Sequence, residues 1–443
     1  MLLSAEEENN TNAARCTRRA AADAVSAVAP TSALAPFRIR AFRYQWPADL
    51  ATSWAFEMET LILGWYVLVE TQSVFLLTLF ASMQYLGTLI APMFGVMGDR
   101  LGHRNVLSGM RTIYALLAST LCALIVLGAF SPGYALISAG LLGLVRPSDV
   151  GMRAALVGDT MPAEQMVGAM SIQRTTQDSA KVMGALTGAG LVALLGMGPA
   201  YLVVACLYAS SVALTLKARS VRAAKRLEAR AVPASVSPWR DLRLGLSYVR
   251  RTPALLALMC LAFLLNLTAF PLFNGLMPYV AKEVYGTDRT GLGYLVAGAA
   301  FGSLLGSIWL TRFGGSIRPG RWMILGGIGW YSMLLVFAYV PWHGLGVAVL
   351  MLAGFAQSMS QVPMSAILLR TSDEQFRGRV MGIRMLMIYG NLPGLLLAGP
   401  LIARFGYSAT ATFYCVFGLA FAIFIAWRWR ADFWSLRAAA NRR

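Results

Sequence analysis

The chain has 443 residues, is 57% hydrophobic and only 13% charged, and has a mean hydropathy of +0.60, which excludes a soluble globular protein because so much apolar surface requires lipid. Its net charge of +18 does not indicate a nucleic-acid partner, since the basic residues lie mainly between apolar runs. Two distant histidines and scattered cysteines argue against a metal site, a Ser-His-Asp enzyme and a disulfide framework, so neither an enzyme nor a cofactor is expected.

Residues 1–44 lack the basic start and apolar core of a signal peptide, and we predict that they form a mobile cytoplasmic tail. Beyond them, apolar runs recur with the roughly 20 residues that a membrane-spanning helix requires. We predict an all-α membrane protein whose twelve transmembrane helices form two six-helix bundles, residues 45–216 and 254–430. The predicted spans are 45–68, 73–96, 105–129, 134–158, 166–194, 198–216, 254–281, 290–311, 321–341, 344–369, 380–403 and 409–429.

The first span carries two carboxylates near its middle, Glu57 and Glu59. An unpaired carboxylate at that depth prefers to be protonated. Residues two apart lie about 200° apart around a helix, so only one of the two is expected to face a central cavity. A carboxylate that alternates between a protonated and an arginine-paired state is the simplest proton-coupling device in this chain, and Asp178 of the fifth span is the other candidate. The alternative is a purely structural ion pair.

The connection between the second and third spans reads GVMGDRLGHR over residues 95–104. Its glycines permit a close helix approach and a tight turn, while Asp99 can cap a helix or pair with an arginine of a neighbouring helix. Such a pair would latch one conformation, and an ordinary polar turn is the alternative. In the second half of the chain Thr311 stands where the aspartate would be, so we expect a weaker latch there. The latch residues are Gly95, Asp99, Arg100, Gly102 and Arg104.

The fourth span carries Arg146, Asp149 and Arg153 on one helical face. A guanidinium near the middle of the bilayer is costly unless it is paired or hydrated, so Arg146 is a candidate functional residue. Asp149 can neutralise either arginine within the helix, and for Arg153 we favour this local pairing.

The fifth span carries Arg174, Asp178 and Lys181, again on one face. They lie roughly 12 to 22 Å from the predicted cytoplasmic side at 1.5 Å per residue, where they cannot all face lipid. We expect Asp178 to line a cavity or to form an interhelical pair, whereas extension of Arg174 toward the membrane surface is an equally good alternative.

Residues 217–253 form the longest hydrophilic stretch and are strongly basic, so we predict a linker between the bundles. Every other connection is also basic, while the intervening ones are nearly bare of cations. By the positive-inside rule, the linker, both termini and the tail 431–443 should be cytoplasmic in a multi-pass protein of the cell inner membrane. Further polar lining is predicted within the spans, with interhelical hydrogen bonding as the alternative for each side chain. These candidates are Gln84, Tyr85, Asn266, Gln357 and Asn391.

The chain repeats itself at an offset of 210 residues, which aligns Arg174 with Arg384 and three glycines with glycines. The pair Glu164-Gln165 meets Glu374-Gln375 at the same offset. Two six-helix halves related by duplication follow, and Arg384 joins the candidate residues of the substrate cavity.

These features carry a resemblance to a known family. Residues 95–104 resemble the signature of the major facilitator superfamily except at His103, and Leu142-x-x-x-Arg146 is similar to its buried-arginine motif. Two further segments extend the resemblance, namely PFRIRAFRYQW at residues 36–46 and DEQFRGRVMG at residues 373–382. With them, the chain resembles the branch of the superfamily that contains enterobactin-type siderophore exporters and macrolide or multidrug efflux pumps.

The resemblance implies a secondary transporter that works by alternating access and exports an amphipathic small molecule, siderophore-like or drug-like, in exchange for protons. It also implies a monomer, whose partners are the substrate, protons and the lipid bilayer. Gly184-x-x-x-Gly188 partly resembles the family's antiporter motif, but Ala185 replaces its proline, so the direction of transport stays open. Proton-coupled uptake or uniport of a metabolite is one alternative, and a non-transporting membrane sensor or scaffold with the same fold is another.

Overall fold

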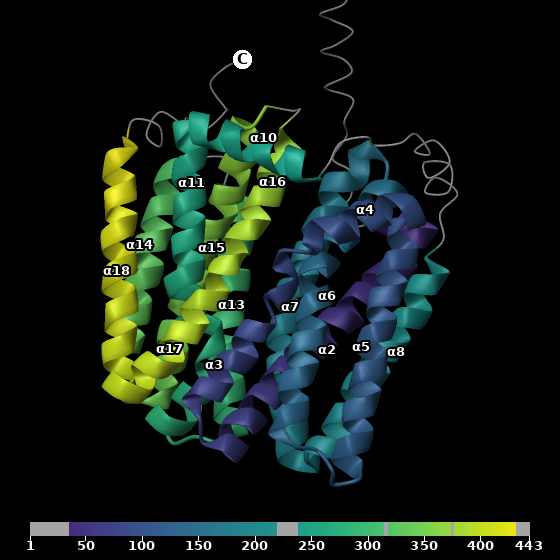
Figure 1. Ribbon diagram of the computed structural model, residues 1–443, viewed down its shortest axis with the longest axis vertical. Helices are drawn as coiled ribbons and strands as arrows, with labels where there is room; N and C mark the ends of the chain where they lie inside the picture. Colours follow the sequence, from purple (N-terminus) through teal and green to yellow (C-terminus); the bar gives the residue numbers. More distant parts are fainter. Residues whose placement is uncertain (1–34, 219–237, 314–317, 374–375, 431–443) are drawn as a thin grey trace, which may run out of the picture.

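The computed structural model describes residues 35–218, 238–313, 318–373 and 376–430, and these residues contain helices and no strand (Figure 1). The predicted tails up to residue 34 and beyond residue 430, and the linker residues 219–237, lie outside the described ranges. The long helices are α2 (Arg40–Thr71), α3 (Val74–Met83), α4 (Ala91–Leu101), α5 (His103–Val126), α6 (Pro132–Thr160), α7 (Ala163–Leu195), α8 (Met197–Lys217), α10 (Pro238–Arg251), α11 (Pro253–Leu264), α13 (Arg289–Phe313), α14 (Pro319–Phe337), α15 (His343–Thr371), α16 (Arg377–Leu386), α17 (Asn391–Phe405) and α18 (Tyr407–Arg428).

Short helical turns join some of these helices into single spans. They are η1 (Ala35–Arg38), η2 (Leu86–Thr88), η3 (Leu265–Ala269), η4 (Pro271–Gly275), α12 (Met277–Tyr279), η5 (Val280–Val284) and η7 (Met387–Gly390). The second span is α3, η2 and α4, the seventh runs from α11 to η5, and the eleventh is α16, η7 and α17. Eight described helical segments are long and apolar enough to cross a membrane, and four further spans are interrupted, charged or shorter, so the predicted twelve-helix fold is confirmed.

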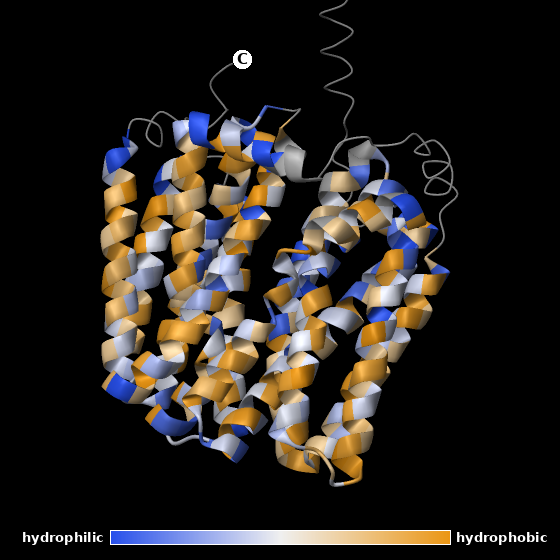
Figure 2. Ribbon diagram, viewed as in Figure 1, coloured by the Kyte–Doolittle hydropathy of each residue, from blue (hydrophilic) through white to orange (hydrophobic). Residues whose placement is uncertain are grey.

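Apolar side chains cover the outside of the molecule, as a lipid-exposed surface requires. On α18, for example, Phe413, Phe417, Phe421 and Phe424 are all exposed, and neighbouring rings of this series contact one another along the helix. Figure 2 shows hydrophobic residues along the outer helices and hydrophilic residues at the ends of the bundles and inside the N-terminal bundle.

The two ends of the bundles differ. We call the end that carries α10 and the Gly102 turn the linker face, and the end that carries the Gln72 and Gly286 turns the opposite face. Within the predicted linker, residues 238–251 form the helix α10, which packs on α16: the rings of Tyr248 and Phe376 stack with centroids 4.3 Å apart. The Tyr248 hydroxyl also lies 3.1 Å from Asp373 Oδ2.

Glycines bring the N-terminal bundle (α2 to α8) and the C-terminal bundle (α11 to α18) into contact in their opposite-face halves. A methyl group added at Gly293 of α13 would lie 2.6 Å from the Ala189 Cβ and 3.2 Å from the Ala185 carbonyl oxygen of α7. A methyl group at Gly399 of α17 would lie 3.0 Å from the Phe75 Cα of α3. Only hydrogen fits at both positions, so the two backbones approach as closely as helices can.

A hydrogen bond closes the same end, because Lys282 Nζ donates to Gln72 Oε1 over 2.7 Å between the bundles. Toward the linker face the bundles diverge: α3 packs on α17, but their continuations α4 and α16 lie apart (Figure 1). The bundles are therefore in contact at the opposite face, and α4 and α16 lie apart toward the linker face.

Candidate functional site

The signature loop forms the turn from α4 to α5. Gly102 has φ of 85°, a left-handed conformation that favours glycine, and α5 begins at the next residue. His103, where the sequence departs from the signature, places its Nδ1 2.6 Å from Asp159 Oδ2 at the end of α6. The side chain of Asp99 lies outside the described residues, so the predicted latch stays a prediction. Of the other latch residues, Arg104 donates to Asn105 at 3.0 Å, Arg100 is exposed, and Gly95 has open space beside it.

A first charge cluster surrounds Asp49 of α2, deep in the N-terminal bundle. Arg111 of α5, which is fully buried, donates to Asp49 Oδ1 and also to the Thr215 hydroxyl of α8. Arg153 Nε lies 3.8 Å from Asp49 Oδ1, and Gln173 Nε2 of α7 donates to Asp49 Oδ2 over 3.2 Å. Asp49 thus binds side chains of α5, α6 and α7, and Arg111 extends the cluster to α8. These contacts offset the desolvation of the cations.

The structure shows which arginine of the fourth span Asp149 neutralises. Its Oδ2 accepts from Arg153 Nη2 over 2.5 Å, so the local pair is formed with Arg153, whose Nη1 also donates to the Ser53 hydroxyl over 2.6 Å. Arg146 turns to another partner on α2.

That partner is Glu59, which is only 1% exposed. Arg146 Nη2 donates to Glu59 Oε2 over 2.6 Å, and the hydroxyls of Tyr201 and Tyr208 on α8 donate to its two oxygens over 2.9 and 2.8 Å. The Arg146 guanidinium also lies 3.3 Å from the centre of the Phe56 ring, a close cation–π contact. All three partners come from α6 and α8 inside the N-terminal bundle, so Glu59 points into that bundle.

Glu57 is placed differently, as the 200° separation predicts. It is partly buried and forms no hydrogen bond or ion pair with any described residue. Its Cβ faces α7, where a methyl group at Gly184 would lie 2.6 Å from it. The charged side chains that act on Glu57 are, in decreasing order, Lys181, Arg146 and Asp178. Glu57 therefore lies beside α7 on the side of α2 that faces away from α8.

The predicted residues of the fifth span lie near Glu57 on α7. Asp178 is 1% exposed and lies 3.2 Å from Arg174 Nε, a pair one helical turn apart, whereas Arg174 is 55% exposed. Lys181 is exposed and has no ion pair among the described residues. Arg146 is paired with Glu59 and Arg174 with Asp178, so Lys181 is the cation left to balance Glu57.

Three of the five predicted polar lining residues form hydrogen bonds across helices. Asn391 of α17 donates to Asn266 Oδ1 in η3 over 2.7 Å, and Ser303 of α13 donates to Gln357 Oε1 of α15 over 2.8 Å. Gln84 and Tyr85 are partly buried at the break between α3 and η2, and Tyr85 lies within electrostatic range of Glu57. The structure therefore brings Tyr85, Glu57, Asp178 and Lys181 into one region.

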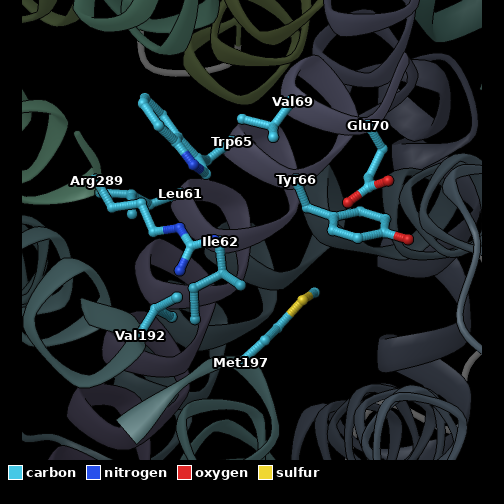
Figure 3. Close-up of a pocket in the computed structure, with 9 residues that line it drawn as sticks. All are labelled: Leu61, Ile62, Trp65, Tyr66, Val69, Glu70, Val192, Met197 and Arg289. Atoms are coloured by element: carbon cyan, nitrogen blue, oxygen red, sulfur yellow. The ribbon is translucent and has the colours of Figure 1, made fainter. Parts of the chain in front are cut away.

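A mostly apolar pocket lies elsewhere, toward the opposite face (Figure 3). It is a small cavity of about 40 Å³ between α2, α7, α8 and the start of α13. Trp65, Tyr66 and Met197 supply much of its wall, while Glu70 and Arg289 are its charged residues. None of the predicted site residues lines it.

Several residues of the buried network are not among the predicted site residues, namely Asp49, Arg111, Gln173, Tyr201 and Tyr208. Asp49 and Arg111 carried a detectable signal, because each is an isolated charge inside an apolar span. The tyrosines carried none, since tyrosine is common at helix ends and interfaces.

The comparisons with known proteins agree with this architecture. A family model described as the Major Facilitator Superfamily matches residues 50–314 and 259–443. The enterobactin exporter EntS of Escherichia coli O1:K1 / APEC is 25% identical over 176 residues, which are 40% of this chain and 42% of that protein. The multidrug efflux pump Tap of Mycolicibacterium fortuitum is 28% identical over 170 residues, 38% of this chain and 40% of that protein. The matched region thus spans about two fifths of the length of these relatives, and the predicted resemblance is confirmed.

Solved structures show the same fold at low identity. The nucleoside transporter NupG superposes with a TM-score of 0.65 at 14% identity, covering 90% of this chain and 100% of that one. The human organic anion transporter MFSD10 (TETRAN) superposes with a TM-score of 0.60 at 16% identity, covering 87% and 98%.

Proposed function

The chain belongs to the major facilitator superfamily of membrane transporters, and we propose that it exports an amphipathic small molecule from a bacterial cell in exchange for protons. The siderophore exporter and the multidrug pump among its relatives support export, and the basic linker face supports a cytoplasmic location for that face. The bundles open toward the linker face, so the substrate enters from the cytoplasm and the opposite face opens next.

The observation that carries proton coupling is the contrast between Glu57 and the other carboxylates inside the N-terminal bundle. Asp49, Glu59, Asp149 and Asp178 each lie within 4 Å of an arginine nitrogen. Glu57 has no such partner and remains partly exposed. A carboxylate that is held by arginine stays ionised, whereas one without a partner exchanges its proton with the solvent that reaches it.

Glu57 then couples the proton to the conformational change. Ionised Glu57 balances Lys181 only through water, so it favours a state in which solvent reaches both side chains. Protonated Glu57 can be enclosed as the bundles rock, because it carries no charge into the closed interface. After the substrate has left, Glu57 binds a proton from the opposite face, and the transporter without substrate returns to the state that opens at the linker face. There Glu57 releases the proton, and the next substrate molecule binds.

The test is proton-driven efflux by the Glu57→Gln variant. We expect no efflux above background when a proton gradient is imposed on cells loaded with labelled siderophores, macrolides or cationic dyes, because glutamine cannot exchange a proton. The matched control is Glu70→Gln, at the exposed end of the same helix, which should retain wild-type efflux. Efflux by Glu57→Gln at the wild-type rate would refute the role of Glu57.

Proton-coupled uptake is the second candidate, and Ala185 is the observation that favours it. The antiporter motif of the family has proline at this position, and Ala185 instead lies in the close contact with Gly293. The direction of substrate movement in everted membrane vesicles decides between the two: accumulation inside the vesicles supports export, and its absence together with uptake by intact cells supports import.

A further inference from the structure

The internal repeat keeps one intramembrane arginine in each half but keeps its carboxylate in only one. Arg174 and Arg384 align at the offset of 210 residues. One turn after Arg174 stands Asp178, which lies 3.2 Å from its Nε; one turn after Arg384, the aligned position is Ile388. The arginine of the C-terminal bundle has therefore lost the partner that neutralises its counterpart.

No described carboxylate inside the C-terminal bundle takes that place. The acidic residues between positions 254 and 428 are Glu283, Asp288, Asp373 and Glu374. Of these, Glu283, Asp288 and Asp373 lie at or beyond the ends of the spans. Asp373 is engaged at the linker face with Tyr248 of α10. In contrast, the spans of the N-terminal bundle carry five carboxylates and five cations away from their ends, namely Asp49, Glu57, Glu59, Asp149 and Asp178 with Arg111, Arg146, Arg153, Arg174 and Lys181. Arg384 is thus a positive charge that no described carboxylate inside its own bundle balances.

The guanidinium of Arg384 is held inside the bundle. Its Nη2 donates to Gln361 Oε1 on α15 over 2.7 Å, and its Nε is buried without a hydrogen-bond partner. Gln361 lies ten residues before the end of α15 at Thr371, about 15 Å along the helix. Arg384 therefore does not extend to the linker face, although a lone cation facing lipid would do so.

The position of Arg384 also places it next to the boundary between the bundles. It lies one turn before η7, and η7 packs on η2 of the N-terminal bundle. Tyr85, directly before η2, is within electrostatic range of Glu57. Arg384 thus lies in the part of the eleventh span where the bundles begin to diverge toward the linker face.

We propose that Arg384 and Gln361 bind an anionic group of the transported molecule, so that the substrate is an amphipathic acid with a carboxylate or a similar planar anion. The inference rests on the proposed transport function and names its substrate class. Arginine presents a planar fork of donors that matches two carboxylate oxygens, and a charge-assisted pair in a desolvated site is strong. Gln361 fixes the fork through its carbonyl oxygen, and its amide nitrogen donates to no described residue, so it can donate to the same anion.

The test is equilibrium binding of a matched pair of fluorescent probes to the purified protein in detergent. Dansyl-leucine and dansyl-leucinamide share one apolar body and differ in one carboxylate. We expect the wild-type protein to bind the acid at least about tenfold more tightly than the amide, because a hydrogen bond to a charged group contributes about 1.5–3 kcal/mol and 1.4 kcal/mol is tenfold. In Arg384→Gln this preference should disappear while binding of the amide is unchanged. Arg384→Lys should keep part of the preference, because lysine keeps the charge and loses the fork.

Arg404→Gln is the matched control, since Arg404 is an exposed arginine at the far end of the same span, and it should keep the wild-type preference. Unchanged amide binding by Arg384→Gln shows that the variant is folded. Equal affinity of the wild type for the two probes, binding of neither, or a preference that survives Arg384→Gln would overturn the proposal. Binding is measured without a proton gradient, so a failure of proton-driven export leaves this result intact, and the reverse also holds.

Discussion

Glu59→Gln is expected to lower the free energy of unfolding by about 3–5 kcal/mol, because it leaves the buried Arg146 without its carboxylate. The two side chains lie 2.6 Å apart, and Glu59 is 1% exposed. Glutamine keeps the shape, and its one oxygen can accept from one of the two tyrosine hydroxyls while its amide nitrogen can donate to the other. The loss therefore measures mainly the missing charge. Chemical unfolding of the purified protein in mixed micelles provides the measurement.

Two variants make this result specific. Glu57→Gln is the same substitution two residues earlier in the same helix, and it should change the unfolding free energy by less than about 1 kcal/mol because no ion pair is lost. Glu59→Gln combined with Arg146→Met removes both charges and should recover most of the stability. Equal losses for Glu57→Gln and Glu59→Gln would contradict the assignment of Glu59 to a structural pair and Glu57 to the proton.

Gly293→Ala is expected to prevent closure of the opposite face. The added methyl group would lie 2.6 Å from the Ala189 Cβ and 3.2 Å from the Ala185 carbonyl oxygen, and neither atom can rotate away. Because the clash exists only while the bundles touch at this end, the population should move toward a state that is open at the opposite face. Transport turnover should then fall to a small fraction of the wild-type rate, since alternating access requires both states.

Spin labels at Glu70 and Glu283, which are exposed residues of the two bundles near the opposite face, report this shift as a longer interlabel distance. Gly190→Ala serves as the control, because it adds the same methyl group one residue after Ala189 and meets no atom within 4 Å. A distance distribution that Gly293→Ala leaves unchanged would show that the glycine contact does not govern closure.

Hydropathy and loop charge were sufficient to predict the spans, because a bilayer imposes one length and one polarity on every crossing. The breaks inside spans were not predictable in the same way. The second span breaks beside Gly87, where the backbone of α3 and η2 approaches that of α6 at Leu144, and this close approach is a property of two helices together. A hydropathy window records neither partner.

The site shows the same division between local and long-range information. The 200° rule correctly separated Glu57 from Glu59, because helical geometry is local, but it did not say which of them points into the bundle. Asp149 faced two arginines on its own helix, and the choice was decided by Glu59, which lies on another helix and takes Arg146. The partners of a buried charge come from packing, so their identity required the structure.

The charge network also constrains the order in which the N-terminal bundle can assemble during synthesis. A carboxylate in the centre of a helix costs about 2.5–3.5 kcal/mol when that helix enters lipid alone. The partners of Glu59 are Arg146 on α6 and the hydroxyls of Tyr201 and Tyr208 on α8, which emerge from the ribosome long after α2. The first helix therefore reaches its final charge pairing only after the sixth has been made, whereas α13, α15 and α18, whose spans carry charges only at their ends, depend on no later helix for the pairing of a central charge.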